Sequence, residues 1–219
     1  MKKTLYSLML SDEVIREIDL LAHRMGTNRS NLVNMILAEH VQLRTPEQRV
    51  NDIFNAIEEL MVDSRELVPS LTPNAPYMEL RSCLEYKYRP TVRYEVELRH
   101  TAEPGQPIGL LSVIFRTQSA GLIEALTIFF NCWKSIEDSL LPIPREYSLE
   151  DGRFTRTLAY PTANGKSAME LSAKQLAGVI ADYIRLLDRL LKAYVAGNLS
   201  EAGVASEYRA QLQSRQVLI

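Results

Sequence analysis

Three histidines and two cysteines are the side chains of this chain that most readily bind metal ions or act as nucleophiles. Cys83 and His100 could approach each other across a predicted hairpin, but two ligands do not complete a tetrahedral zinc site. His23 and His40 fall on predicted helices as surface or interface residues, and Cys132 falls on an apolar helix as a packed thiol. We therefore expect no metal site and no cofactor.

The segment 164–167, Asn-Gly-Lys-Ser, ends like a P-loop, in which a glycine-rich backbone and a lysine hold nucleotide phosphates. That motif needs an earlier glycine at the position that Tyr160 occupies, so we interpret the segment as a polar turn. The neighbouring carboxylates Glu58 and Glu59 diverge on a predicted helix and are typical of a solvated face. With no Ser-His-Asp grouping either, we expect that the chain is not an enzyme.

The chain has 219 residues, with 25 Lys and Arg against 27 Asp and Glu, which gives a formal net charge of −2. This balance is ordinary for one or two globular domains and does not mark the whole chain as a nucleic-acid binder. The longest apolar run, 122–133, falls short of the ~20 residues that a membrane-spanning helix needs. Without a signal-peptide pattern or enough cysteines for a disulfide framework, we expect a cytoplasmic protein.

The N-terminal residues are patterned as one short strand and two helices. Residues 2–10 alternate as a strand, Ser11 is suited to cap a first helix, Gly26 to end it, and Asn28 to cap a second. One strand and two short helices cannot close a core, because they leave a strand edge and two apolar stripes exposed. We therefore expect two copies of this segment to fold together.

A different pattern follows. Thr45 opens another helix with a capping box, and the proline-containing stretch 64–76 is interpreted as a linker. The elements predicted beyond it are alternating strands over 78–86 and 92–98, a central strand over 108–116, a helix over 118–141, a strand over 153–160, and helices over 171–195 and 200–215. We divide the chain into residues 1–44, a connecting segment 45–76, and an α+β domain 77–219.

The N-terminal layout, in which Gly26-Thr27-Asn28-Arg29-Ser30 joins the two helices, resembles the ribbon-helix-helix family of DNA-binding proteins, which includes the Arc, MetJ and CopG repressors. The resemblance covers about residues 3–43. It implies an intertwined homodimer whose two strands form an antiparallel ribbon that enters the major groove of double-stranded DNA.

The resemblance also implies roles for individual residues. The buried side of the ribbon would carry Tyr6, Leu8 and Leu10, and its base-facing side would carry Leu5, Ser7 and Met9. The phosphate contacts would come from Asn28, Arg29 and Ser30 at the positive end of the second helix, with Lys2 and Lys3 adding charge.

The base-facing side departs from the family, whose members usually place polar or basic side chains there. Leu5 and Met9 can contact thymine methyl groups, but they have no donors for guanine or adenine. Three interpretations stay open. The ribbon prefers T-rich sites, or it relies on phosphates and DNA shape, or it serves dimerisation alone. A larger α+β fold with no DNA role is the structural alternative.

Tyrosines and basic residues gather around the predicted hairpin, as Tyr77, Tyr86, Tyr88 and Tyr94 with Arg81, Lys87, Arg89, Arg93 and Arg99. This composition fits a surface for an anionic ligand or partner, and it equally suits a half-exposed antiparallel sheet, which we favour. We expect a dimeric DNA-binding transcriptional regulator with a small-molecule or protein effector at its C-terminal domain. The alternative is an antitoxin or plasmid-maintenance protein whose C-terminal domain binds a partner protein.

Overall fold

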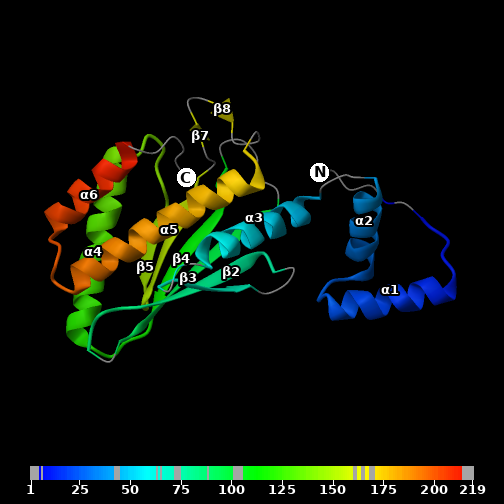
Figure 1. Cartoon of the computed structure of the whole chain (residues 1–219), viewed down its shortest axis with the longest axis horizontal. Coiled ribbons are helices and arrows are strands. Elements are labelled where there is room, and N and C mark those ends of the chain that lie inside the picture. Colours follow the sequence, from blue (N-terminus) through cyan, green and yellow to red (C-terminus); the bar gives the residue numbers. More distant parts are fainter. Residues whose placement is uncertain are drawn as a thin grey trace.

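The computed structural model describes residues 5, 7–41, 45–62, 64, 66–71, 75–87, 89–100, 106–159, 162–163, 166–167 and 171–213. Lys2, Lys3, Tyr6 and Tyr88 lie outside these described residues. Within them the chain is α+β, as predicted, with helices packed on an antiparallel sheet (Figure 1).

The main sheet has six antiparallel strands in the order β1-β2-β3-β4-β6-β5. Their bounds are β1 (Val68–Leu71), β2 (Tyr77–Cys83), β3 (Thr91–Leu98), β4 (Gly109–Phe115), β5 (Tyr147–Glu150) and β6 (Arg153–Leu158). The predicted hairpin is confirmed as β2 and β3, and β4 lies inside the sheet, as its apolar sequence indicates. A second, two-stranded sheet pairs β7 (Thr162–Ala163) with β8 (Lys166–Ser167).

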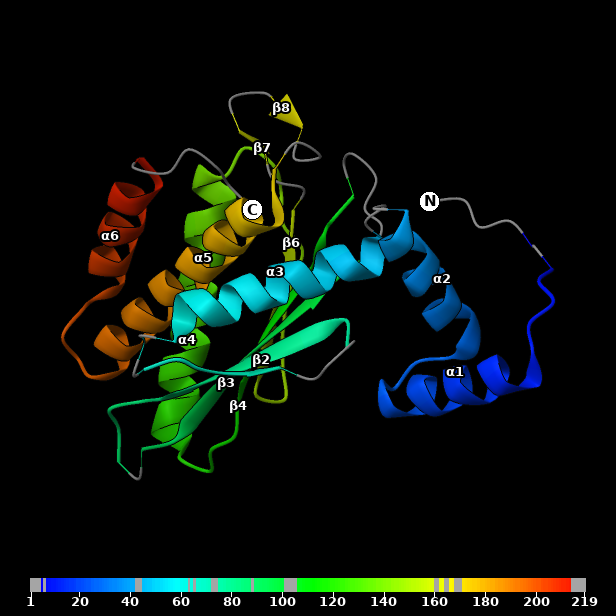
Figure 2. The same cartoon turned by 45° about the vertical axis from the view of Figure 1, so that its right-hand side comes forward.

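Helices cover one face of the main sheet. They are α3 (Pro46–Met61), α4 (Ala120–Leu140) and α5 (Ala173–Val195), and α6 (Glu201–Gln213) packs outside them against α4 and α5. Figures 1 and 2 both show α3 and α5 running side by side across the sheet. The inward strand positions follow the alternation predicted from sequence, so that Leu80, Tyr94 and Val113 are all fully buried.

The segment 45–76, which we predicted to be a connector, contributes several of its described residues to this core. The capping box at Thr45 is confirmed, and Phe54 and Ile57 of the helix that it opens are completely buried against the rest of the domain. The predicted linker contains β1, which pairs along β2 and places Pro69 opposite Leu80. A proline is tolerated there because β1 is an edge strand, where a missing N–H breaks no second ladder.

The two N-terminal helices are α1 (Asp12–Arg24) and α2 (Arg29–His40). They pack on each other and lie at the N-terminal end of α3, away from the sheet (Figure 2). Together they bury little of their own surface, since Ala22 is the buried residue of α1 and Leu32 that of α2. Among the described helices, none combines the length and apolar character that a membrane crossing requires.

Candidate nucleic-acid interface

The first helix begins and ends where the sequence predicts. Ser11 lies in extended backbone, and its side chain accepts a hydrogen bond from the Val14 N–H at 3.4 Å. Asp12 and Glu13 occupy the first turn, where the helix dipole favours negative charge. Gly26 follows the helix with a φ of +62°, a left-handed conformation that glycine adopts without steric cost.

The second helix exposes hydrogen-bond donors at its start. The Asn28 side chain caps it by accepting from the Asn31 N–H at 2.9 Å, and the Asn28 carbonyl accepts from the Leu32 N–H. The N–H groups of Arg29 and Ser30 have no intrahelical acceptor, because the first four donors of any helix lack one. They lie at the positive end of the helix dipole, which is the geometry that binds phosphate.

The side chain of Arg29 is already paired within this unit. Its Nε donates to Asp19 Oδ1 at 2.6 Å, and its Nη2 donates to the second carboxylate oxygen of Asp19, so the two side chains form a two-bond fork between α2 and α1. The hydrogen bond from Arg29 holds the pKa of the Asp19 carboxyl below its usual range. Sequence reasoning missed Asp19, because a partner on another helix leaves no local signal.

The described residues of the predicted ribbon are solvent-exposed in the single chain. Leu5 is 96% and Met9 102% exposed, Ser7 is exposed, and Leu8 and Leu10 are 52% and 39% exposed. Residue 5 and residues 7–10 form no strand, which is consistent with a strand whose hydrogen-bonding partner would be a second chain. The ribbon and its division into two sides therefore stay predictions.

Apolar side chains also remain uncovered on both helices. The exposed ones are Val14 and Leu20 on α1, Ile36 and Leu37 on α2, and Val41 directly after α2. On α1, a groove of about 340 Å³ is lined by Val14, Ile18 and Leu21 between Glu13, Glu17 and Arg24. So much uncovered apolar surface on a unit this small indicates an interaction site.

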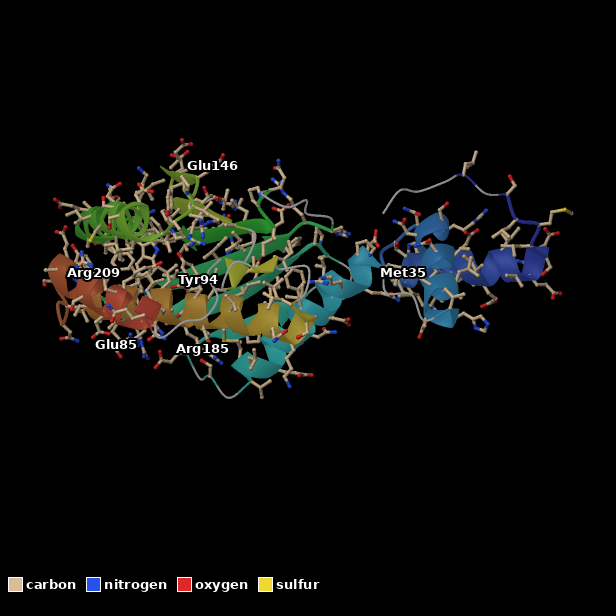
Figure 3. The ribbon with its side chains drawn as sticks, turned by 90° about the horizontal axis from the view of Figure 1, so that it is seen from above. Met35, Glu85, Tyr94, Glu146, Arg185 and Arg209 are labelled. Carbon is tan, nitrogen blue, oxygen red and sulfur yellow. The ribbon has the colours of Figure 1, made fainter. Side chains whose placement is uncertain are left out.

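The tyrosines of the hairpin that the structure describes do not all lie on the side of its arginines. Tyr94 points into the core, where its hydroxyl donates to Asp188 of α5 at 2.9 Å, and Figure 3 shows it between the sheet and that helix. Arg81 and Arg93 lie on the opposite face of the same strands, where they contact Glu79 at 3.5 and 3.4 Å. Strand alternation thus separates Tyr94 from Arg81 and Arg93, whereas the exposed Tyr77, four residues before Arg81 on β2, lies on the arginine side.

A buried polar cluster that the sequence analysis missed lies between α4, α5, α6 and the sheet. Glu137 is fully buried and accepts from the hydroxyls of Tyr147, Tyr183 and Tyr208, each at 2.9 Å, and from Arg156 Nε at 2.8 Å. Each carboxylate oxygen thus has two donors. Its position seven residues after Phe130, on the inward side of α4, is the signal that could have placed it in the core.

The predicted approach of Cys83 to His100 is wrong. Cys83 pairs with Thr91 at one end of the hairpin, whereas His100 follows Leu98 at the other end and lies 3.7 Å from Glu47 Oε1 through its Nδ1. Cys132 is half-buried and packs against the core, and burial raises the pKa of its thiol. Among the described residues, no three His, Cys, Asp or Glu side chains are grouped so that they could hold a metal ion.

Comparison with known proteins returned no match: no family model, no curated protein and no solved structure resembles this chain closely enough to be assigned to it.

Proposed function

We propose that this chain is a dimeric DNA-binding regulator whose N-terminal unit, residues 1–44, contacts the DNA. The observation that carries the proposal is the combination in one small unit of a capped helix start with open N–H donors and an uncovered apolar surface. The open donors at Arg29 and Ser30 suit a phosphate. The apolar residues suit a second copy of the same segment.

In this proposal the segments from Leu5 to Leu10 of two chains pair as an antiparallel ribbon. Leu8 and Leu10 would then be covered by the helices of both chains, which removes apolar surface from water at about 25 cal/mol per Å². The paired ribbon would also satisfy backbone donors and acceptors that a lone strand leaves to solvent. Folding and dimerisation of this unit would therefore be one process.

The dimer would place two copies of α2 with their N-termini toward the same DNA. The N-terminus of each α2 would bind a phosphate through its backbone N–H groups. The fork between Arg29 and Asp19 would fix the direction of α2 relative to α1. Because Leu5 and Met9 offer no polar donors, we propose that phosphate contacts and DNA shape outweigh contacts to base edges.

The proposal is tested with Ser30→Glu in the full-length protein. A carboxylate in the first turn of α2 suits the helix dipole, so the fold is retained, but it occupies the place of the phosphate. We expect DNA affinity to fall at least tenfold in fluorescence anisotropy at low salt. The matched control is Ser206→Glu on the exposed side of α6, which makes the same charge change and should leave affinity unchanged. Equal affinities of the two variants would contradict the proposal.

A further inference from the structure

The face of the main sheet that α3, α4 and α5 leave uncovered carries arginines on β2, on β3 and directly after β4. Arg81 of β2 and Arg93 of β3 are direct cross-strand partners, and Arg93 in turn lies opposite Ile114 of β4. Arg116 directly follows β4, and it lines one hollow together with Ile114 and the two other arginines. Three guanidinium groups thus come to one region, two from β2 and β3 and one from the end of β4.

These arginines surround a hollow of about 320 Å³. It is lined by Arg81, Thr91, Arg93, Ile114 and Arg116. Ile114 is only 8% exposed, whereas Arg81, Thr91 and Arg116 are exposed and Arg93 is half-buried. The hollow therefore has an apolar residue that is nearly covered and a rim of donors that solvent can reach.

The positive charge at the hollow is only partly balanced. Among the described residues, the carboxylate of Glu79 pairs with two of the arginines, with Oε2 at 3.5 Å from Arg81 Nη2 and Oε1 at 3.4 Å from Arg93 Nη1. Within the described part of the chain, the Arg116 side chain has no hydrogen bond or ion pair, and Glu150 and Asp151 line a neighbouring hollow with it. Like charges directly opposite in a sheet, such as Arg81 and Arg93, destabilise it, so a bound anion would relieve a cost that the free protein carries.

We propose that this hollow binds a small, multiply charged phosphate-bearing anion. Guanidinium groups hold phosphate oxygens through paired N–H donors, and the Thr91 hydroxyl can add a neutral donor or acceptor. The arginines converge on one hollow of the volume that small ligands occupy, whereas a nucleic-acid backbone is followed by a stripe of positive charge. The hollow is the effector site of the proposed regulator, although anion binding there does not itself depend on DNA binding.

The test is calorimetric titration of the full-length protein with pyrophosphate, compared with sodium chloride at matched ionic strength. Arg116→Gln is the informative variant, because it removes a lining donor without breaking a hydrogen bond or ion pair to a described residue. Arg209→Gln on α6, labelled in Figure 3 at a distance from the sheet, makes the same charge change as a control. We expect the wild type and Arg209→Gln to bind pyrophosphate equally and Arg116→Gln to bind it about tenfold more weakly.

Two results would overturn the proposal. One is a wild-type response to pyrophosphate no larger than the response to chloride. The other is an unchanged pyrophosphate affinity in Arg116→Gln, and if that variant also lost affinity for duplex DNA, the arginines would be assigned to nucleic acid. The Ser30→Glu variant distinguishes this site from the proposed DNA contact, since it should bind pyrophosphate like the wild type while its affinity for DNA falls.

Discussion

Arg29 at the start of α2 and Asp19 on α1 form a two-bond fork that ties together the two N-terminal helices. Both side chains are about half exposed, so the fork is screened by solvent and salt and sets direction more than stability. Its position immediately after Asn28 places it beside the N–H groups that we propose bind phosphate. The fork therefore sets the direction, relative to α1, of the helix end that we propose contacts the DNA.

The acid titration of Asp19 reports the fork directly. Because Arg29 lowers the pKa of Asp19 below its ordinary value of 3.8, the fork adds stability above that pH, and the contribution disappears as pH falls through the lowered pKa. We expect Arg29→Ala to move the Asp19 midpoint upward in an NMR carboxyl titration. A midpoint that is the same in both proteins would show that the fork does not form in solution.

Two adjacent ribbon positions should respond in opposite ways to the same substitution. In the proposed dimer Leu8 is covered and Met9 faces the DNA, so Leu8→Lys should abolish the dimer, whereas Met9→Lys should leave it intact. Met9→Lys should also tighten DNA binding and steepen its salt dependence by about one phosphate contact per chain. Sedimentation and anisotropy measure the two effects. If Leu8→Lys and Met9→Lys had the same effect, the assignment of Leu8 to the covered side and of Met9 to the DNA-facing side would be contradicted.

Removing the charge of the buried Glu137 should lower the free energy of unfolding far more than removing the charge of an exposed glutamate. In Glu137→Gln, Arg156 remains fully buried beside an amide instead of a carboxylate, and breaking a buried pair of this kind costs about 3 kcal/mol or more. Glu124→Gln on the exposed side of the same helix should stay within about 0.5 kcal/mol of the wild type. Urea unfolding measures both. A comparable free energy of unfolding for the two variants would refute the stabilising role of the buried pair of Glu137 and Arg156.

Stability should decline in alkaline solution because of buried tyrosine. Burial first, and then the neighbouring Asp188, raise the pKa of Tyr94 well above its ordinary value of 10.0. The unfolded chain therefore loses this proton at a lower pH than the folded chain, and stability falls as pH rises above about 10. Tyr94→Phe should show a shallower fall in denaturant unfolding measured across this range. If stability fell equally steeply with pH in Tyr94→Phe and in the wild type, Tyr94 would be accessible to solvent in the folded protein.

Features set by neighbouring residues could be predicted, and features set by distant ones could not. The caps at Ser11, Asn28 and Thr45 could be predicted because a capping side chain and the backbone N–H that donates to it lie three residues apart. The hairpin was found from alternation. By contrast, β1 was missed because it is short and contains Pro69, and only its pairing with β2 makes it a strand.

The candidate sites divide in the same way. The helix start at Asn28 to Ser30 could be located from sequence, since helix termini have local signals. The fork between Arg29 and Asp19, and the position of Arg116 beside Arg81 and Arg93, depend on tertiary packing and strand order. The ribbon is harder still, because its partner strand would belong to another chain.

Sedimentation velocity of the full-length protein mixed with a labelled duplex, chosen by selection from random DNA, tests the central claim most directly. We predict that the free protein sediments as a dimer and that two chains move with each duplex site at low salt, with the complex dissociating as salt rises. A folded monomer, or an intact dimer that leaves the DNA free at low salt, would contradict the account.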